Sequence, residues 1–179
     1  MTHGAVSRRR WLLQAGSGMA LAAGARWSQA GAGRLQLGQA APPLVLHTLD
    51  GRSIATHDLL GKIAVVTFWA TWCPHCVEEL PLLSRYAAQH AAQGLEVLAF
   101  SLDSPDDLPE VRRRSAPLSF PTGLLGSAWA GGYGRIWRLP VSFVIDRAGR
   151  LVDNGWDDKQ PVWTSERLKR VLDPLLQTS

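Results

Sequence analysis

The chain has 179 residues, with 19 basic side chains, 15 acidic side chains and two cysteines. The basic excess comes entirely from residues 1–30, which contain four arginines and no acidic residue, so residues 31–179 carry 15 charges of each sign. This balance gives no indication of a nucleic-acid partner, and we expect none. The remaining 149 residues are enough for one domain with its own core and too few to predict two.

The first thirty residues have the layout of a bacterial export signal. Consecutive arginines, Arg8–Arg10, precede a weakly apolar run, and the segment ends in the small residues Ser28 and Ala30. Ser-Arg-Arg followed by Trp-Leu-Leu resembles the twin-arginine subtype. We therefore predict a twin-arginine signal peptide at residues 1–30, a mature domain at residues 31–179 and a periplasmic location.

Two alternatives for this segment stay open. It could be a disordered basic tail, although a tail needs neither an apolar run nor small residues at its end. It could also be retained as an uncleaved membrane anchor. Gln14, Ser17 and three glycines interrupt the apolar stretch. The stretch is also shorter than the ~20 predominantly apolar residues that span a bilayer, so the anchor is the second choice.

The mature part predicts a mixed α/β pattern in chain order. LVLHTLDGRSIA alternates around Asp50-Gly51, which predicts a β-hairpin. KIAVVTFW is a near-continuous apolar run, typical of a strand buried on both faces. Apolar residues at helical spacing then predict a helix that runs to about Ala92 and is ended by Gly94. LEVLAFS predicts a second buried strand, which completes a right-handed crossover unit.

The second half predicts shorter elements. A short helix is expected through Arg112–Arg114. VSFVID and RLVDN flank a turn at residues 147–149, so they predict an antiparallel hairpin. An apolar stripe from Leu168 to Leu175 predicts a terminal helix.

The cysteines lie in FWATWCPHC, between the first buried strand and the helix. This order places Cys73 at the helix N-terminus and Cys76 within its first turn. Unpaired backbone N–H groups and the helix dipole stabilise a thiolate there, and the thiolate is the nucleophile in disulfide exchange. Zinc would need four ligands, and haem attachment would need a histidine where Val77 stands. A structural disulfide would close only a four-residue loop, so the spacing favours a redox function.

A family resemblance rests on FWATWCPHC, Glu79, Pro81 and the later RLPVSFVIDRAGRLV. These stretches resemble the thioredoxin superfamily and, within it, the exported TlpA/ResA-like thiol-disulfide oxidoreductases, over roughly residues 38–176. The resemblance implies an α/β thioredoxin fold with a mixed central sheet and an added N-terminal β-hairpin. It also implies an insertion after the second core strand, which we place at Asp103–Gly134.

The resemblance also implies roles for single residues. Cys73 would be the attacking thiol and Cys76 the resolving thiol. Pro140 matches the proline that the family keeps in cis opposite the cysteine pair, where it would turn the backbone of Leu139 toward a substrate strand. Trp72 matches the tryptophan beside the motif, as part of the docking surface.

Two positions depart from better-known patterns. Thioredoxins carry a buried aspartate six residues before the first cysteine, where this chain has Thr67. Glu79 matches an acid that the TlpA/ResA-like group places near the site, and it could take over the proton transfer. The Pro74-His75 dipeptide resembles the motif of the oxidant DsbA. A cationic His75 would stabilise the Cys73 thiolate, which makes the disulfide more oxidising.

Taken together, these features predict a periplasmic thiol-disulfide oxidoreductase that acts on protein thiols and disulfides and needs no cofactor beyond its own cysteine pair. Related proteins keep thiols of apocytochrome c or of metal-centre assembly factors reduced, and a membrane electron donor of the DsbD or CcdA kind recharges them. One alternative is a DsbA-like, disulfide-forming oxidant. Another is a copper metallochaperone, although copper-delivering relatives typically separate their cysteines by three residues and add a distal histidine.

Overall fold

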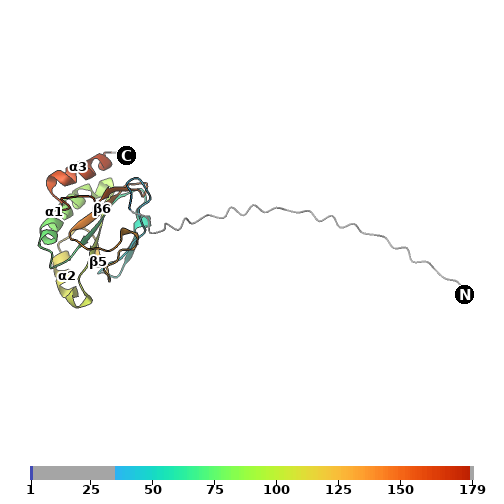
Figure 1. Cartoon of the computed structure of the whole chain (residues 1–179), viewed down its shortest axis with the longest axis horizontal. Coiled ribbons are helices and arrows are strands. Elements are labelled where there is room, and N and C mark those ends of the chain that lie inside the picture. The colour runs from blue at the N-terminus through green and yellow to red at the C-terminus, as the bar shows by residue number, and fades with distance from the viewer. Residues whose placement is uncertain (2–34, 178–179) are drawn as a thin grey trace.

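A computed structural model describes residue 1 and residues 35–177 (Figure 1). Apart from Met1, the predicted export signal lies outside these residues. In the described part of the chain, no helix is both long and apolar enough to cross a membrane.

A five-stranded mixed sheet forms the centre of the domain. Its strand order is β5-β4-β3-β6-β7. The central strand β3 (Ile63–Trp69) pairs in parallel with β4 (Leu95–Ser101) and antiparallel with β6 (Val141–Ile145). The strand β7 (Leu151–Asn154) pairs antiparallel with β6, and β5 (Thr122–Leu124) pairs in parallel with β4. The predicted mixed sheet is confirmed.

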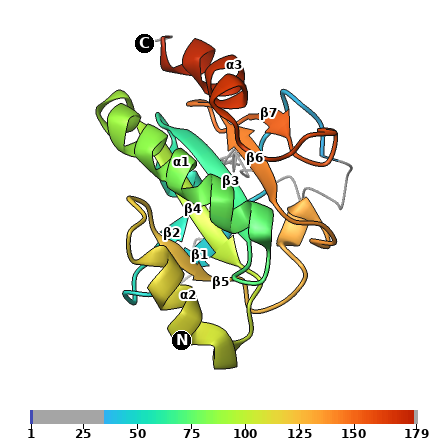
Figure 2. The same cartoon turned by 90° about the vertical axis from the view of Figure 1, so that its left-hand side faces the viewer.

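Both faces of the sheet are covered, which explains the unbroken apolar run of β3. Successive side chains of a strand point to opposite faces, and Val65 and Val66 accordingly belong to two different buried clusters. The cluster of Val65 includes side chains from three helices: α1 (Pro74–His90), α2 (Leu108–Ser115) and α3 (Ser165–Leu176). Figure 2 shows α1 lying across the sheet, with α3 beside the β6 and β7 side.

The opposite face is covered by shorter segments. The strands β1 (Val45–His47) and β2 (Ser53–Ala55) form a separate antiparallel pair, which confirms the N-terminal hairpin. Leu46 of β1 packs in the same buried cluster as Phe68 and Tyr133. A 3₁₀ turn, η1 (Thr56–Leu59), connects this hairpin toward β3.

The expected insertion between β4 and β6 contributes to the sheet itself. It contains two 3₁₀ turns, η3 (Pro105–Asp107) and η4 (Gly131–Tyr133), in addition to α2 and β5. Because β5 extends the sheet as an edge strand, this segment is an integral part of the core.

The helix α1 begins and ends close to the predicted positions. Cys73 is its N-cap residue and Pro74 its first residue, where a missing N–H costs nothing. A 3₁₀ turn, η2 (Ala91–Gln93), follows the helix. Gly94 ends this turn with a φ of 82°, a conformation that favours glycine.

Candidate active site

The cysteine pair lies where β3 passes into α1. Cys73 and Cys76 form a disulfide with an S–S distance of 2.06 Å and a Cα–Cα distance of 5.3 Å. The Cys76 N–H donates a hydrogen bond to Cys73 Sγ over 3.2 Å, so the sulfur caps the helix N-terminus. A backbone donor and the helix dipole thus act together on the Cys73 sulfur, and both favour a negative charge there.

The two sulfurs differ in their surroundings. Cys73 is 6% exposed, whereas Cys76 is fully buried. An incoming thiol or disulfide can therefore reach only Cys73 without a movement of the protein. This asymmetry agrees with the predicted attacking and resolving roles.

A buried acid fixes the loop that leads to Cys73. Asp103 follows β4 and accepts hydrogen bonds from the Thr71 backbone N–H at 2.9 Å and from Thr71 Oγ1 at 2.6 Å. Ser101 Oγ donates to the same carboxylate over 2.5 Å. Two residues before Cys73, the backbone is thus tied to the end of the neighbouring strand.

The segment expected to receive a substrate strand, Leu139–Pro140, lies beside this loop. The Leu139–Pro140 peptide bond is cis, as expected from the resemblance. Val141 pairs with Phe68 near the end of β3, so Pro140 lies next to the start of the cysteine loop. Leu139 packs against the buried cluster that contains both cysteines.

Exposed tryptophans lie along the segments that form this edge. Trp72, directly before Cys73, is 65% exposed. Trp137 is 69% exposed, and its ring stacks on Trp156 with 5.5 Å between centroids and 12° between planes. The Arg138 guanidinium lies over both of these rings. Since Trp137 precedes Leu139 by two residues, the edge next to Leu139 offers aromatic surface to a partner.

Glu79 is buried, not exposed as an ordinary helix glutamate would be. It is 2% exposed, and its Oε2 accepts a 2.6 Å hydrogen bond from the Trp163 backbone N–H. Burial raises the pKa of Glu79 to about 8, against smaller lowering effects of the Trp163 N–H and the Arg167 charge. Within residues 35–177, its Oε1 has no hydrogen-bond partner. One carboxyl oxygen is thus left available for a proton.

Thr67 occupies the position of the thioredoxin aspartate and belongs to a neutral network. The Trp163 Nε1–H donates to Ser142 Oγ over 3.0 Å, and Ser142 Oγ donates to Thr67 Oγ1 over 2.8 Å. All three side chains are buried. Trp163 is therefore linked to Thr67 through Ser142 and binds Glu79 directly through its backbone N–H.

His75 points away from the interior. Its side chain is 71% exposed, and Nδ1 lies 3.5 Å from Glu78 Oε2. A nearby carboxylate offsets part of any positive charge that His75 could direct at Cys73.

The fold and this site can now be compared with known proteins. The family model described as AhpC/TSA matches residues 37–154. The chain belongs to the AhpC/TSA family. The thiol-disulfide oxidoreductase ResA of Bacillus thuringiensis (strain Al Hakam) is 33% identical over 121 residues, which are 67% of this chain and 69% of the relative. ResA of Geobacillus thermodenitrificans is 32% identical over 116 residues, 64% of this chain and 66% of the relative.

A solved structure agrees with this membership of the AhpC/TSA family. A protein from Chlorobium tepidum, assigned provisionally as the thiol:disulfide interchange protein DsbE, has a TM-score of 0.68 and 25% identity. The match covers 80% of this chain and 99% of that one. The chain is thus a thioredoxin-fold thiol-disulfide oxidoreductase homologous to ResA, and the predicted fold and family are confirmed.

Sequence reasoning did not find three residues of the site. Asp103, Trp163 and Arg167 contact the cysteine loop or Glu79 only through the tertiary structure. Asp103 had a usable signal, since a polar residue directly after a buried strand lies at the end of the sheet where the cysteine loop also starts. Nothing local marks Trp163 among the eight tryptophans of the chain.

Proposed function

We propose that this chain is exported to the periplasm and keeps selected protein thiols reduced there. The observation that carries the proposal is the pairing of a disulfide, of which only Cys73 keeps any exposure, with a buried acid on the same helix. Glu79 lies three residues after Cys76, so both side chains share one face of α1.

The reductive cycle starts from the dithiol form. The Cys73 thiolate attacks a substrate disulfide, forms a mixed disulfide and releases one substrate thiolate. Cys76 then loses its proton to Glu79 and attacks the Cys73 sulfur, which releases the second substrate thiolate. Two electrons pass to the substrate, and the Cys73–Cys76 disulfide remains, which is the state of the structure.

The raised pKa of Glu79 suits this proton transfer. An ordinary thiol has a pKa of about 8.5 and an ordinary glutamate about 4.3, so moving a proton from the thiol to the carboxylate would be uphill by about 6 kcal/mol. With the pKa of Glu79 at about 8, the proton passes in either direction at little cost. The same carboxyl can return the proton to Cys76 when a donor reduces the disulfide.

The proposed partners follow from the family resemblance. The substrates are protein disulfides such as those of apocytochrome c or of a metal-centre assembly factor. A membrane electron donor of the DsbD or CcdA kind returns the disulfide to the dithiol form. No cofactor beyond the cysteine pair enters this cycle.

A disulfide-forming oxidant is the second candidate. The Cys76 N–H bond to Cys73 Sγ favours the thiolate, and stabilising the reduced form makes a disulfide more oxidising. The Pro74-His75 dipeptide adds to this only as far as His75 keeps a positive charge. The copper metallochaperone stays the weakest candidate, since the cysteines are separated by two residues.

The test is the redox state of the cysteine pair in the cell, trapped by alkylation in periplasmic extract. A reductant is found largely as the dithiol, and the purified dithiol reduces insulin. A pair found fully oxidised in a strain with an intact electron donor would contradict the reductive direction. Tight stoichiometric copper binding without insulin reduction would favour the chaperone.

Export has a separate test. Arg8→Lys combined with Arg9→Lys retains the charge and should leave the protein in the cytoplasm if the twin-arginine route is used. Unchanged periplasmic delivery in a strain that lacks this translocon would contradict the route, and would leave the exchange chemistry standing.

A further inference from the structure

Arg167 is a buried cation that the exchange cycle does not use. It is 2% exposed and lies in the first turn of α3. Its Nη2 donates to Asp153 Oδ2 over 2.7 Å, and its Nε forms an ion pair of 2.9 Å with Asp158 Oδ2. Its Nη1 donates to the Pro161 carbonyl over 2.8 Å. A buried charge is tolerated only with such partners, and these partners come from β7 and from the loop that follows it.

The same guanidinium lies against Trp163. Its Cζ is 3.9 Å from the centroid of the Trp163 ring, which is a close cation–π contact. Arg167 thus holds the loop of residues 155–164 at three points: Asp158, Pro161 and Trp163. Trp163 is the residue whose backbone N–H binds Glu79.

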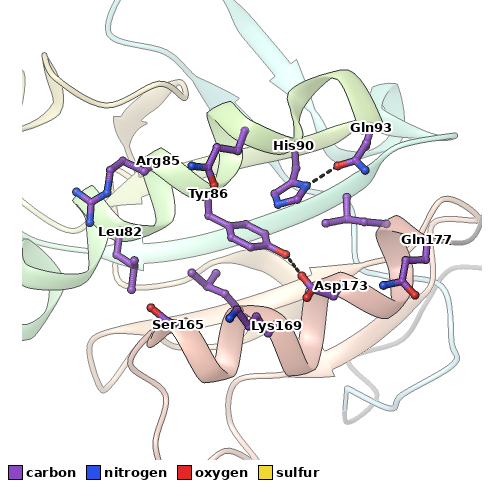
Figure 3. A pocket seen from close by; sticks show the side chains of 12 residues that line it. Leu82, Arg85, Tyr86, His90, Gln93, Ser165, Lys169, Asp173 and Gln177 are labelled. Carbon is purple, nitrogen blue, oxygen red and sulfur yellow. Dashed lines mark hydrogen bonds between the residues drawn. The ribbon is translucent and has the colours of Figure 1, made fainter.

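The end of α3 is fixed to α1 independently of Arg167. Tyr86 Oη of α1 donates a hydrogen bond to Asp173 of α3, at a pocket of about 480 Å³ between the two helices (Figure 3). Neither cysteine lines this pocket. A change at Arg167 should therefore release the loop while α3 stays docked on α1.

We propose that Arg167 is a positioning residue for the proton transfer: it holds residues 155–164 against α1 so that Trp163 covers and orients Glu79. This inference rests on the proposed role of Glu79 as the proton acceptor of Cys76. It gives the loop between β7 and α3 a part in the proton transfer, through the Trp163 N–H that binds Glu79.

Arg167 acts on Glu79 in two ways that have opposite signs. Its charge lowers the pKa of Glu79, whereas the loop that it anchors keeps the carboxyl out of water, and burial is the larger influence and raises that pKa. Asp153 and Asp158 also face this region and are paired with Arg167 itself, and Arg170 of the same helix acts on Asp153. The direction in which the pKa of Glu79 moves therefore tells the two effects apart.

The experiment measures the pKa of Glu79 by the carboxyl carbon shift in NMR, in the oxidised full chain. The variants are Arg167→Lys, which retains the charge but not the planar fork of donors, and Arg167→Met, which retains neither. Lys169→Met removes an exposed cation from the same helix and is the matched control.

If Arg167 positions the loop, the pKa of Glu79 falls by about one unit or more in both Arg167 variants, because water reaches the carboxyl. The inflection in the pH profile of the resolving step moves down with it, and Lys169→Met changes neither. If Arg167 acts only through its charge, the pKa stays unchanged in Arg167→Lys and rises in Arg167→Met, which overturns the proposal. Arg167→Lys alone decides the matter if Arg167→Met does not fold.

A different variant, Glu79→Gln, tests the proposed role of Glu79 as proton acceptor. If Glu79→Gln leaves the resolving step unchanged, the proton-acceptor assignment is wrong whatever Arg167 does. If Glu79→Gln slows that step while both Arg167 variants leave the pKa of Glu79 in place, the assignment stands and the positioning role of Arg167 is wrong.

Discussion

The disulfide has an open side and a closed side, and the two are built differently. The open side holds Cys73, the exposed Trp72 and the cis Leu139–Pro140 bond. The closed side holds the buried Cys76 and Glu79, covered by Trp163. The open side is made of segments near the cysteine motif or in strand register with it. The closed side depends on Trp163, which lies 84 residues after Glu79 in the chain.

The difference separates two requirements of disulfide exchange. The attacking sulfur has to meet a large partner, so it needs accessible backbone and apolar surface. The resolving sulfur has to lose a proton, so it needs an acid whose pKa is close to its own, and burial raises the pKa of Glu79 toward that range. One helical turn brings the two environments together.

The largest effect is expected when the Cys73–Cys76 pair itself is broken. Cys73→Ser should abolish exchange, whereas Cys76→Ser should still attack and then stall as mixed disulfides with its substrates, because no thiol releases them. Trapping by both variants is compared on non-reducing gels. Equal trapping, or reductase activity retained in Cys73→Ser, would contradict the assignment of Cys73 as the attacking sulfur and Cys76 as the resolving sulfur.

The second prediction removes only the proposed proton acceptor of the closed side, Glu79. Glu79→Gln keeps the shape of the side chain and should slow the resolving step by about 100-fold, the lower end of general-base effects. Stopped-flow measurement of mixed-disulfide decay checks this. Glu78→Gln, one residue earlier and exposed, is the control. The same rate in Glu79→Gln and in the control would leave Glu79 without a catalytic role.

The third prediction concerns stability against pH. The pKa of Glu79 is about 8 in the folded protein and near 4.5 in the unfolded chain. Between these two pH values the carboxyl is ionised in the unfolded chain but still protonated in the folded protein. The free energy of unfolding of the wild type should therefore fall as pH rises from 4.5 to 8, by a few kcal/mol in total. Glu79→Gln lacks this loss, so the variant gains on the wild type across that window. Urea unfolding of the oxidised proteins at pH 5 and pH 8 measures it, and parallel curves at both pH values would contradict the burial argument.

The smallest expected effect lies on the open side. His75→Ala should lower the reduction potential, because it removes a partial positive charge near the Cys73 thiolate. Exposed charges at a helix N-terminus contribute about 0.3–1 kcal/mol, so the shift should be about 20 mV or less. Glu78→Gln frees His75 from its neighbour and should move the potential upward. Equilibration with glutathione measures both, and a shift of the same sign in the two variants would contradict a charge effect of His75.

Much of the open side could be predicted from the sequence, because its signals are local. Two cysteines between an apolar strand and a helix place a sulfur at the helix N-terminus, and the structure has Cys73 as the N-cap. The hairpin at Asp50-Gly51 and the strand KIAVVTFW have equally local causes, in turn chemistry and in hydrophobic pattern. The cis bond before Pro140 was expected only through the family resemblance.

The closed side was decided by tertiary structure. In the sequence, Glu79 directly follows Glu78, and nothing local distinguishes a buried glutamate from an exposed one there. Its burial depends on Trp163, which Arg167 holds through Asp158 and Pro161, and none of these residues is near the cysteines in sequence. The sequence by itself thus determined the α/β fold class and the place of Cys73 at the helix N-terminus, since helix ends, turns and strand patterns depend on neighbouring residues. Only the packed structure decided that the Glu79 carboxyl is buried and its pKa raised, since water has to be excluded by segments from distant parts of the chain.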